Sequence, residues 1–146
     1  MSDLDVVVVG SGITGFCAAL GAHDAGARRI LLAESEGVVG GSSRLSGGMV
    51  MGAGTAMQRA AGIDDDADAL YREYLSLNQW QVDAAVVRAF CDNCGPTIDW
   101  LVSLGVEFVD ELVIGGEERL PRTHWAAGRG QGIIDALNRA ARERDI

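Results

Sequence analysis

Residues 5–15 of the chain read DVVVVGSGITG, and this stretch decides the fold class. Its unbroken run of four valines predicts a strand of a parallel β-sheet that is buried on both faces. A helix is expected over residues 13–25, because apolar side chains recur there with helical spacing, and Gly26 is placed to end it. The apolar run at residues 30–33 predicts a second strand, so the chain is expected to open with a βαβ unit.

Gly10, Gly12 and Gly15 form a G-x-G-x-x-G pattern between the predicted strand and helix. The first glycine permits the tight turn, the second lets the backbone approach a diphosphate, and the third lets the helix pack on the strand. Glu34 follows Gly15 by 19 residues, close to the offset of about 20 at which a carboxylate accepts hydrogen bonds from a ribose. This spacing predicts a dinucleotide site, and the carboxylate would repel the 2′-phosphate of NADP.

A second glycine-rich segment, GGSSRLSGG, occupies residues 40–48 within a long loop expected over residues 37–54. Glycines allow close approach of a ligand, and serine hydroxyls donate hydrogen bonds to phosphate or to the polar edge of a flavin. An NAD-binding unit needs no such segment so soon after its carboxylate, whereas FAD has a flavin end that must also be held. The residues alone therefore favour FAD and leave NAD as the alternative.

The rest of the chain is predicted to be mainly helical, with two short strands, which completes an α/β protein. The helices are expected at residues 64–77, 82–90, 96–104 and 131–144, and the strands at residues 106–109 and 112–114. Pro96 is expected to open its helix, where a missing N–H does no harm. The length of 146 residues suits one domain.

The composition excludes several classes of partner. The net charge is -9, and the 12 basic residues, all arginine, are dispersed among 21 acidic ones, so no nucleic acid is expected to bind. No apolar run approaches the roughly 20 residues that a membrane span needs, and the first apolar run is too short for a signal peptide. With three cysteines, the chain is expected to be cytoplasmic, with no metal site.

The chain resembles the FAD-binding domain of the fumarate reductase and succinate dehydrogenase flavoprotein superfamily, with the soluble fumarate reductase and ketosteroid dehydrogenase branches nearest. The motifs that carry the resemblance are DVVVVGSGITG, then LLAES at residues 31–35, then GGSSRLSGG. The stretches at residues 92–108 and 122–146 also look like segments of those proteins. The resemblance implies a Rossmann-like FAD-binding domain over residues 1–146.

The resemblance also implies which residues bind the cofactor and what is missing. The expected FAD contacts are Gly10, Ser11, Gly12, Ile13, Thr14, Gly15, Glu34, Ser35, Gly40, Gly41, Ser42, Ser43, Arg44, Ser46, Gly47 and Gly48. Because no histidine lies in residues 40–48, FAD is expected to be non-covalent. The family's later FAD-binding segment and its capping domain, which supplies the catalytic acid or base, have no counterpart here. We therefore expect an incomplete fold without a catalytic residue.

As a domain of this family, the chain is expected to serve hydride transfer between flavin and a carbon beside a carbonyl or carboxylate, which makes or reduces a C=C bond in a small-molecule substrate. The remainder of the flavoenzyme, or a capping domain, is the expected partner. A non-catalytic nucleotide-binding module is the alternative.

Several conspicuous side chains are expected to have structural roles. Cys91 and Cys94 are placed near the end of a predicted helix, where a packing role is favoured over redox or zinc chemistry. His124 is expected in a loop, solvated or packed rather than at a substrate. Packing in the core or between domains is expected for Trp80, Trp100 and Trp125. Arg44 is as well suited to the surface as to a phosphate.

Overall fold

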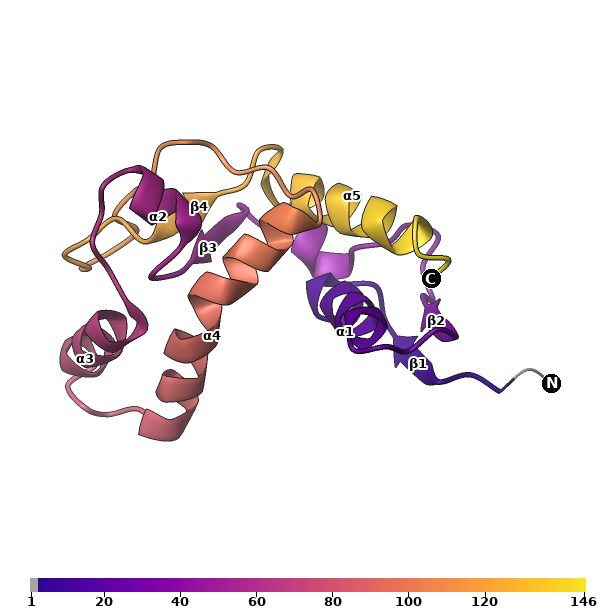
Figure 1. Cartoon of the computed structure of the whole chain (residues 1–146), viewed down its shortest axis with the longest axis horizontal. Coiled ribbons are helices and arrows are strands. Elements are labelled where there is room, and N and C mark those ends of the chain that lie inside the picture. The colour runs from indigo at the N-terminus through magenta and orange to yellow at the C-terminus, as the bar shows by residue number, and fades with distance from the viewer. Residues whose placement is uncertain (1–2) are drawn as a thin grey trace. The chain divides into compact units, whose positions relative to one another are not determined.

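A computed structural model describes residues 3–146, which divide into two compact units. The first unit contains the residues up to Gly48 together with Leu104–Glu107 and Ala126–Ile146, and the second contains Met49–Ser103 and Phe108–Trp125. Figure 1 labels their helices and strands. Each unit is described by itself.

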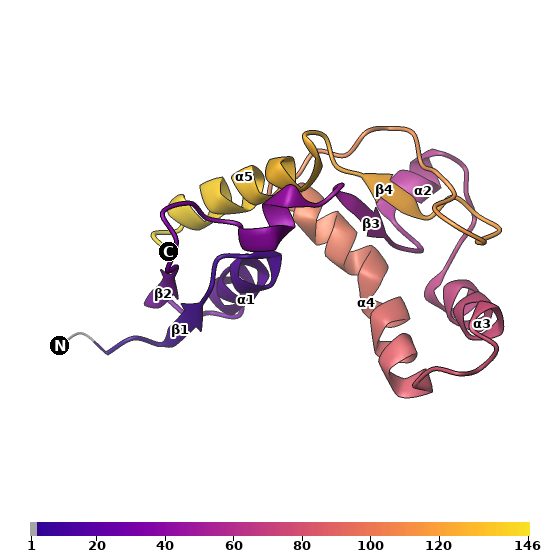
Figure 2. The ribbon, with the colours of Figure 1, turned by 180° about the vertical axis from the view of Figure 1, so that it is seen from behind.

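The first unit contains the expected βαβ arrangement. Strand β1 (Val6–Val9) pairs in parallel with β2 (Ile30–Ala33), in a register that sets Val6 beside Ile30 and Val9 beside Ala33. Helix α1 (Ile13–Asp24) connects the strands and packs against both, as the views from the two sides show (Figures 1 and 2). The predicted α/β fold class and parallel sheet are thereby confirmed.

Helix α1 ends as the glycine at position 26 predicts. The N–H of Gly26 donates to the carbonyl of His23, and the N–H of Ala27 donates to the carbonyl of Ala22. This pair of bonds is the Schellman motif, which supplies donors to the last carbonyl groups of a helix. The motif turns the chain toward β2.

The prediction that the first strand is buried on both faces is wrong for the described residues. Val7 is 54% exposed and Val9 is 86% exposed, whereas alternate residues of β1 are partly buried. Helix α1 packs against both strands, and Val7, Val9 and Leu31 of the two strands are exposed. The apolar character of β1 therefore exceeds what this part of the chain buries.

The loop expected over residues 37–54 contains regular structure. A 3₁₀ helix, η1 (Gly41–Leu45), lies in the first unit, and strand β3 (Met49–Met51) begins the second. The C-terminal helix α5 (Arg129–Arg142) packs on both η1 and α1. It buries Ile134, Leu137 and Ala141, as its periodicity predicts.

The second unit is built on three helices and an antiparallel strand pair. Helix α2 (Ala56–Ala60) starts at Thr55, whose side chain forms a capping box with Gln58. Helix α3 (Ala67–Leu77) starts at Asp66, whose carboxylate accepts a hydrogen bond from the N–H of Ala69. Strand β3 pairs with β4 (Thr123–Trp125), which sets Val50 opposite His124.

Helix α4 (Ala84–Ser103) is continuous through Pro96, so the two helices expected there are one. Proline inside a helix removes a backbone hydrogen bond and costs about 3 kcal/mol. The buried side chains nevertheless form a single stripe with alternating spacings of three and four residues, and burial of this stripe stabilises the continuous helix. They are Val87, Cys91, Cys94, Ile98 and Leu101.

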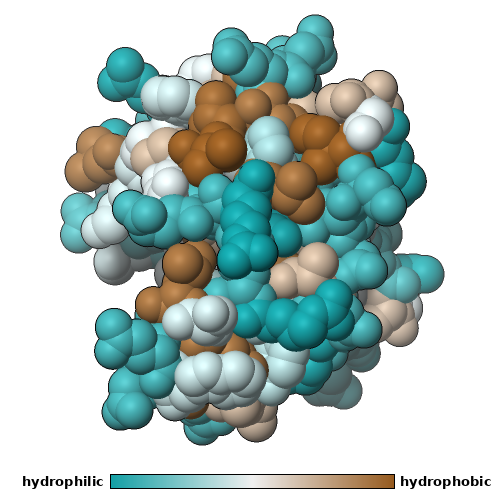
Figure 3. All heavy atoms as spheres, turned by 90° about the vertical axis from the view of Figure 1, so that its left-hand side faces the viewer, coloured by the Kyte–Doolittle hydropathy of each residue, from teal (hydrophilic) through white to brown (hydrophobic). Residues whose placement is uncertain are grey.

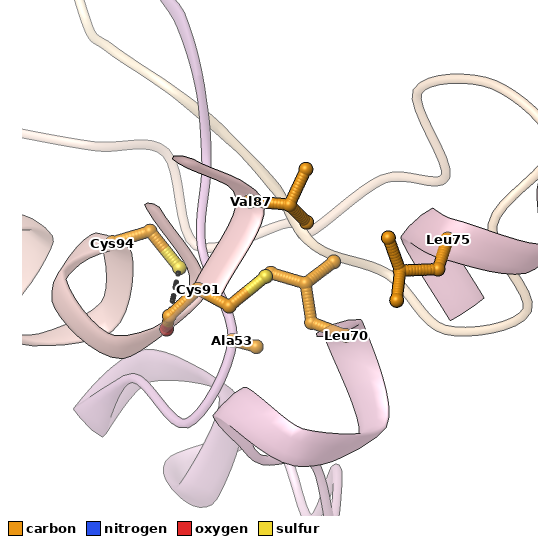
Figure 4. Packing of buried hydrophobic residues seen from close by; sticks show 6 residues of the cluster. All are labelled: Ala53, Leu70, Leu75, Val87, Cys91 and Cys94. Atoms are coloured by element: carbon orange, nitrogen blue, oxygen red, sulfur yellow. Dashed lines mark hydrogen bonds between the residues drawn. The ribbon is translucent and has the colours of Figure 1, made fainter. Parts of the chain in front are cut away.

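The core of the second unit lies where α3 meets α4. Figure 4 shows Leu70 and Leu75 of α3 beside Val87, Cys91 and Cys94 of α4, with Ala53 contributed by the preceding loop. Both cysteines therefore lie in the interior of a helix rather than near its end. Their burial confirms the packing role expected of them, and it raises the pKa of the Cys91 thiol.

The strands expected at residues 106–109 and 112–114 do not form. Residue 113 makes only an isolated bridge with Thr123, and the N–H of Val109 donates to the carbonyl of Trp125. Strand β4 instead forms around His124, where a loop was expected. Residues 123–125 form a strand because their backbone pairs with β3. Local sequence does not predict this strand, because β3 and β4 are far apart in the chain.

The exposure of the aromatic residues differs from residue to residue. Trp80 is 69% exposed and Trp125 is 41% exposed, so neither lies in the core of residues 3–146, and the interdomain packing also expected of them stays a prediction. His124 is fully buried, which confirms the packed alternative.

On the side of the molecule at the left of Figure 1, hydrophobic residues form small patches separated by hydrophilic ones (Figure 3).

Candidate nucleotide-binding site

The turn from β1 into α1 has the geometry that the glycine pattern predicts. Gly10 has φ +96°, and its N–H donates to the carbonyl of Ala33 at 2.7 Å. A Cβ on Gly15 would lie 1.8 Å from the carbonyl oxygen of Gly10, so only glycine allows α1 to approach the strand this closely. The first and third glycines are thus required by the turn itself.

Gly12 leaves the N-terminus of α1 accessible. It is the N-cap residue, and a Cβ placed on it would meet only the hydroxyl oxygen of Ser43, at 3.5 Å. The first amides of a helix have no partner within the helix and bind anions well. Here Ser43 Oγ accepts a hydrogen bond from the N–H of Ile13 at 3.1 Å. The side of Gly12 on which a Cβ would lie is therefore open apart from this hydroxyl.

Glu34 is held at the end of β2 by several donors. Its Oε2 accepts hydrogen bonds from the N–H of Ser11, at 2.9 Å, and from the Ser11 hydroxyl. Its Oε1 accepts from the N–H groups of Ser35 and Glu36, at 2.8 and 3.1 Å. The Ser11 hydroxyl and these amides lower the pKa of Glu34 from 4.5 to about 2. The carboxylate is therefore charged at neutral pH and has a set orientation.

The segment at residues 40–48 joins the same site. The N–H of Gly40 donates to Ser11 Oγ at 3.1 Å, which connects this segment to the first glycine-rich turn. The hydroxyl of Ser46 donates to the carbonyl of Ser43, and the carbonyl of Gly48 accepts from the N–H of Ala126. The structure thus brings together the three sequence motifs that were assigned to the cofactor.

The expected contact residues differ in their accessibility. Three are buried, namely Ser11, Gly40 and Gly48. Partly buried members are Gly10, Gly12, Ile13, Gly15, Glu34, Ser43 and Arg44. The exposed members are Thr14, Ser35, Gly41, Ser42, Ser46 and Gly47. Exposed and partly buried members are available to a ligand, whereas the three buried residues support the others.

Two pockets of the first unit include residues of this site. One, of about 310 Å³, contains Ser11 and Glu34 and extends along α5 to Asn138 and Arg142. The other, of about 390 Å³, lies beside η1 and includes Ser42 and Arg44. The second pocket places Arg44 at the site's border, where both of the roles considered for it remain open.

Close packing of α5 on the 40–48 segment was missed by the sequence analysis. A Cβ on Gly130 would lie 2.2 Å from the carbonyl oxygen of Ser43, and the N–H of Gly130 donates to the carbonyl of Ser46. The recurrence of glycine in residues 128–132, GRGQG, was the signal that a helix approaches another backbone there. Helix α5 therefore supports the shape of the second glycine-rich segment.

Other candidate chemistry is not assembled in the described residues. Within residues 3–146, no group of three or more His, Cys, Asp or Glu side chains is arranged to hold a metal ion. His124 lies in the second unit, where its ring bonds Thr55 Oγ1 and the carbonyl of Arg122. Over the same residues, no helix combines the length and apolar character that crossing a membrane requires.

Comparison with known proteins gives consistent matches. The sequence model of the family described as "FAD binding domain" matches residues 5–146. The chain is 34% identical over 145 residues to a fumarate reductase (cytochrome) of Shewanella frigidimarina, covering 98% of this chain and 25% of that protein. The chain thus spans about a quarter of the length of this curated relative.

Solved structures with the same fold include enzymes of both expected branches. The open conformation of a flavocytochrome c3 fumarate reductase matches with a TM-score of 0.86 at 34% identity, over 98% of this chain and 26% of that one. A 3-ketosteroid-Δ4-(5α)-dehydrogenase from Rhodococcus jostii RHA1 has the same fold, with a TM-score of 0.78 at 23% identity, over 100% of this chain and 38% of that one. These matches confirm the resemblance that the three motifs indicated.

Proposed function

Because the chain belongs to the FAD-binding domain family, we propose that residues 1–146 form the N-terminal part of the FAD-binding domain of a flavin-dependent oxidoreductase. Family membership confirms FAD as the expected cofactor, in preference to NAD. The domain boundary, the contact residues and the activity are part of the proposal, since the relatives extend well beyond the part matched here.

The observation that carries the proposal is the hydrogen-bonded connection of three motifs. Ser11 bonds both Glu34 and Gly40, while Ser43 bonds the first turn of α1 at Ile13. The N-terminus of α1 would hold the diphosphate of FAD. Glu34 would accept hydrogen bonds from the adenosine ribose, and residues 40–48 would bind toward the flavin end.

Non-covalent binding of FAD is part of the proposal. No histidine lies in residues 40–48, and η1 presents Ser42 and Arg44 instead. Hydroxyl, guanidinium and backbone N–H groups offer hydrogen bonds to the cofactor but no nucleophile suited to a flavin link. Acid precipitation of the loaded protein should therefore release all of its flavin into the supernatant.

The reaction class follows from the cofactor and from the similar enzymes. FAD, when bound, would supply hydride transfer to or from a carbon beside a carbonyl or carboxylate of a small molecule, making or reducing a C=C bond. Fumarate reductase and 3-ketosteroid dehydrogenase, the activities for which the similar proteins are named, both belong to this class. We assign no catalytic residue within the chain, and we propose that a capping domain or the remainder of the flavoenzyme supplies it.

The visible absorption spectrum tests the proposed function. Protein expressed from the complete reading frame that contains residues 1–146 should be yellow, or should become yellow on addition of FAD, with the absorption bands of oxidised flavin after removal of free cofactor. A protein that stays colourless after FAD has been added would show the proposal to be wrong. Reduction of the bound flavin, followed by reoxidation with an α,β-unsaturated acid or ketone, would then test the reaction class.

A cytoplasmic location is proposed separately, on the cysteines. Cys17, Cys91 and Cys94 are free thiols, and reducing compartments maintain thiols in this state. Cell fractionation tests this location, and recovery of the protein outside the cytoplasm would contradict it.

A further inference from the structure

Ser11 occupies a central place in the candidate site although it is almost fully buried. It is 1% exposed and lies between β1 and α1, in the first Gly-x-Gly. Its N–H and its hydroxyl both bond Oε2 of Glu34, while its hydroxyl oxygen accepts the N–H of Gly40 at 3.1 Å. A single side chain therefore connects the end of β2 with the start of the second glycine-rich segment.

The direction of each hydrogen bond follows from the donors present. A serine hydroxyl has one proton, and an ionised carboxylate has none to give. The Ser11 proton must therefore point to Glu34, and the N–H of Gly40 occupies an acceptor position on the same oxygen. Because Ser35 and Glu36 engage the opposite carboxylate oxygen, rotation of the carboxylate would break bonds on both sides.

We propose that Ser11 is a positioning residue for FAD, which holds the Glu34 carboxylate in the orientation that receives the adenosine ribose. This inference rests on the proposed function. A glutamate side chain that is free to rotate loses conformational entropy when it binds a ligand, and a preorganised one has lost it already. Bonds from neutral donors to a carboxylate are also stronger than those between neutral groups, so the Ser11 hydroxyl holds Glu34 firmly.

A double-mutant cycle on FAD affinity tests this role. In protein expressed from its complete reading frame, Ser11→Ala should raise the Kd for FAD about tenfold, as expected for loss of one hydrogen bond to a charged group. Glu34→Ala should raise it at least as much. If Ser11 acts through Glu34, the double variant S11A/E34A should bind no more weakly than E34A alone. Ser103→Ala, which removes a hydroxyl on α4 of the second unit, is the matched control and should leave the Kd unchanged.

The pH dependence of FAD binding provides a second readout that a merely structural role would not move. Because the Ser11 hydroxyl is the main cause of the low pKa of Glu34, the wild-type Kd should be constant down to about pH 4. In S11A the pKa of Glu34 should return toward 4.5, so that binding weakens at a higher pH than in the wild type. E34A should lack this dependence. Unfolding curves for each variant establish that it is folded, and Ser11→Gly replaces S11A in the cycle if S11A does not fold.

The outcomes separate the two proposals. A wild type that binds no FAD overturns the proposed function. A wild type that binds FAD, with E34A impaired and S11A normal, overturns only the positioning role. Equal losses from S11A in the wild type and in the E34A variant would also overturn it, because the hydroxyl would then act on its own or through Gly40. The positioning role is supported if S11A weakens FAD binding only when Glu34 is present and also shifts the pH profile.

Discussion

Arg122 binds the carboxylate of Asp65 with two parallel hydrogen bonds in the interior of the second unit. Nε and Nη2 of Arg122 lie 2.7 and 2.8 Å from the two oxygens of Asp65, and the side chains are 1% and 0% exposed. Nη1 of Arg122 bonds Glu73 at 2.8 Å. This group joins the residue before β4 to α3 and to the loop that precedes α3, segments that are far apart in sequence.

Replacing Arg122 by leucine should destabilise the protein by about 3–5 kcal/mol, because Asp65 is then left buried without its counter-charge. Urea denaturation of the variant measures this loss as a change in the free energy of unfolding. Arg59→Leu is the control, since Arg59 forms an exposed ion pair with Asp99 at 3.5 Å and such pairs contribute about 0–1 kcal/mol. Equal effects of the two substitutions would contradict the importance assigned to the buried pair.

Gly15→Ala should disrupt the turn between β1 and α1. The added Cβ would overlap the carbonyl oxygen of Gly10, and neither backbone segment can move without separating the helix from the sheet. We expect at least a tenfold loss of FAD affinity and a lower melting temperature.

Gly21→Ala is the matched control in the same helix, because a Cβ on Gly21 meets nothing within 4 Å. It should stabilise the protein by about 0.5–1 kcal/mol through the higher helix propensity of alanine. A Gly15→Ala variant that melts and binds FAD like Gly21→Ala would refute the assigned close approach.

Substitution of Ser42 and Ser43 by leucine distinguishes a cofactor-binding segment from a simple loop. Ser42 is exposed beside η1, and Ser43 Oγ lies at the first turn of α1. If this segment binds FAD, bulky apolar side chains should weaken FAD binding by at least tenfold, measured by quenching of flavin fluorescence. Unchanged affinity would mean that residues 40–48 do not hold the cofactor.

The stability of the second unit should depend on pH through His124. Its Nδ1–H donates to the carbonyl of Arg122, and its Nε2 accepts from the Thr55 hydroxyl, which itself accepts the N–H of Gln58. This arrangement stabilises the neutral form of the imidazole ring. Burial lowers the pKa of His124 below 6.5.

In the native state His124 therefore binds a proton less readily than it does in the unfolded chain. The stabilising contribution is fully present above pH 6.5, the ordinary value for histidine, and is lost as the pH falls through the lower native pKa. Urea denaturation of the wild type across this range should show the decline, and His124→Gln should reduce its slope. The control His23→Gln, on α1 of the first unit, should retain the slope of the wild type.

Local sequence was sufficient for the first βαβ unit, since each of its determinants lies within a few residues of the element it controls. The valine run, the glycines of the turn and Gly26 at the end of α1 all act over short distances. The same reasoning failed at Pro96, because a local cost was outweighed by a buried stripe on both sides of the proline. It failed again at β4, where pairing with β3 decides the strand.

The sequence by itself determined that a strand, a glycine-rich turn and a helix would form a phosphate-binding end, with a carboxylate at the next strand. These features depend on backbone conformation and on short-range spacing. Only the tertiary structure decided that Ser11 connects Glu34 to Gly40, that Ser43 meets the start of α1, and that α5 supports residues 40–48. Those contacts join residues separated by many positions, and their geometry exists only after packing has brought the segments together.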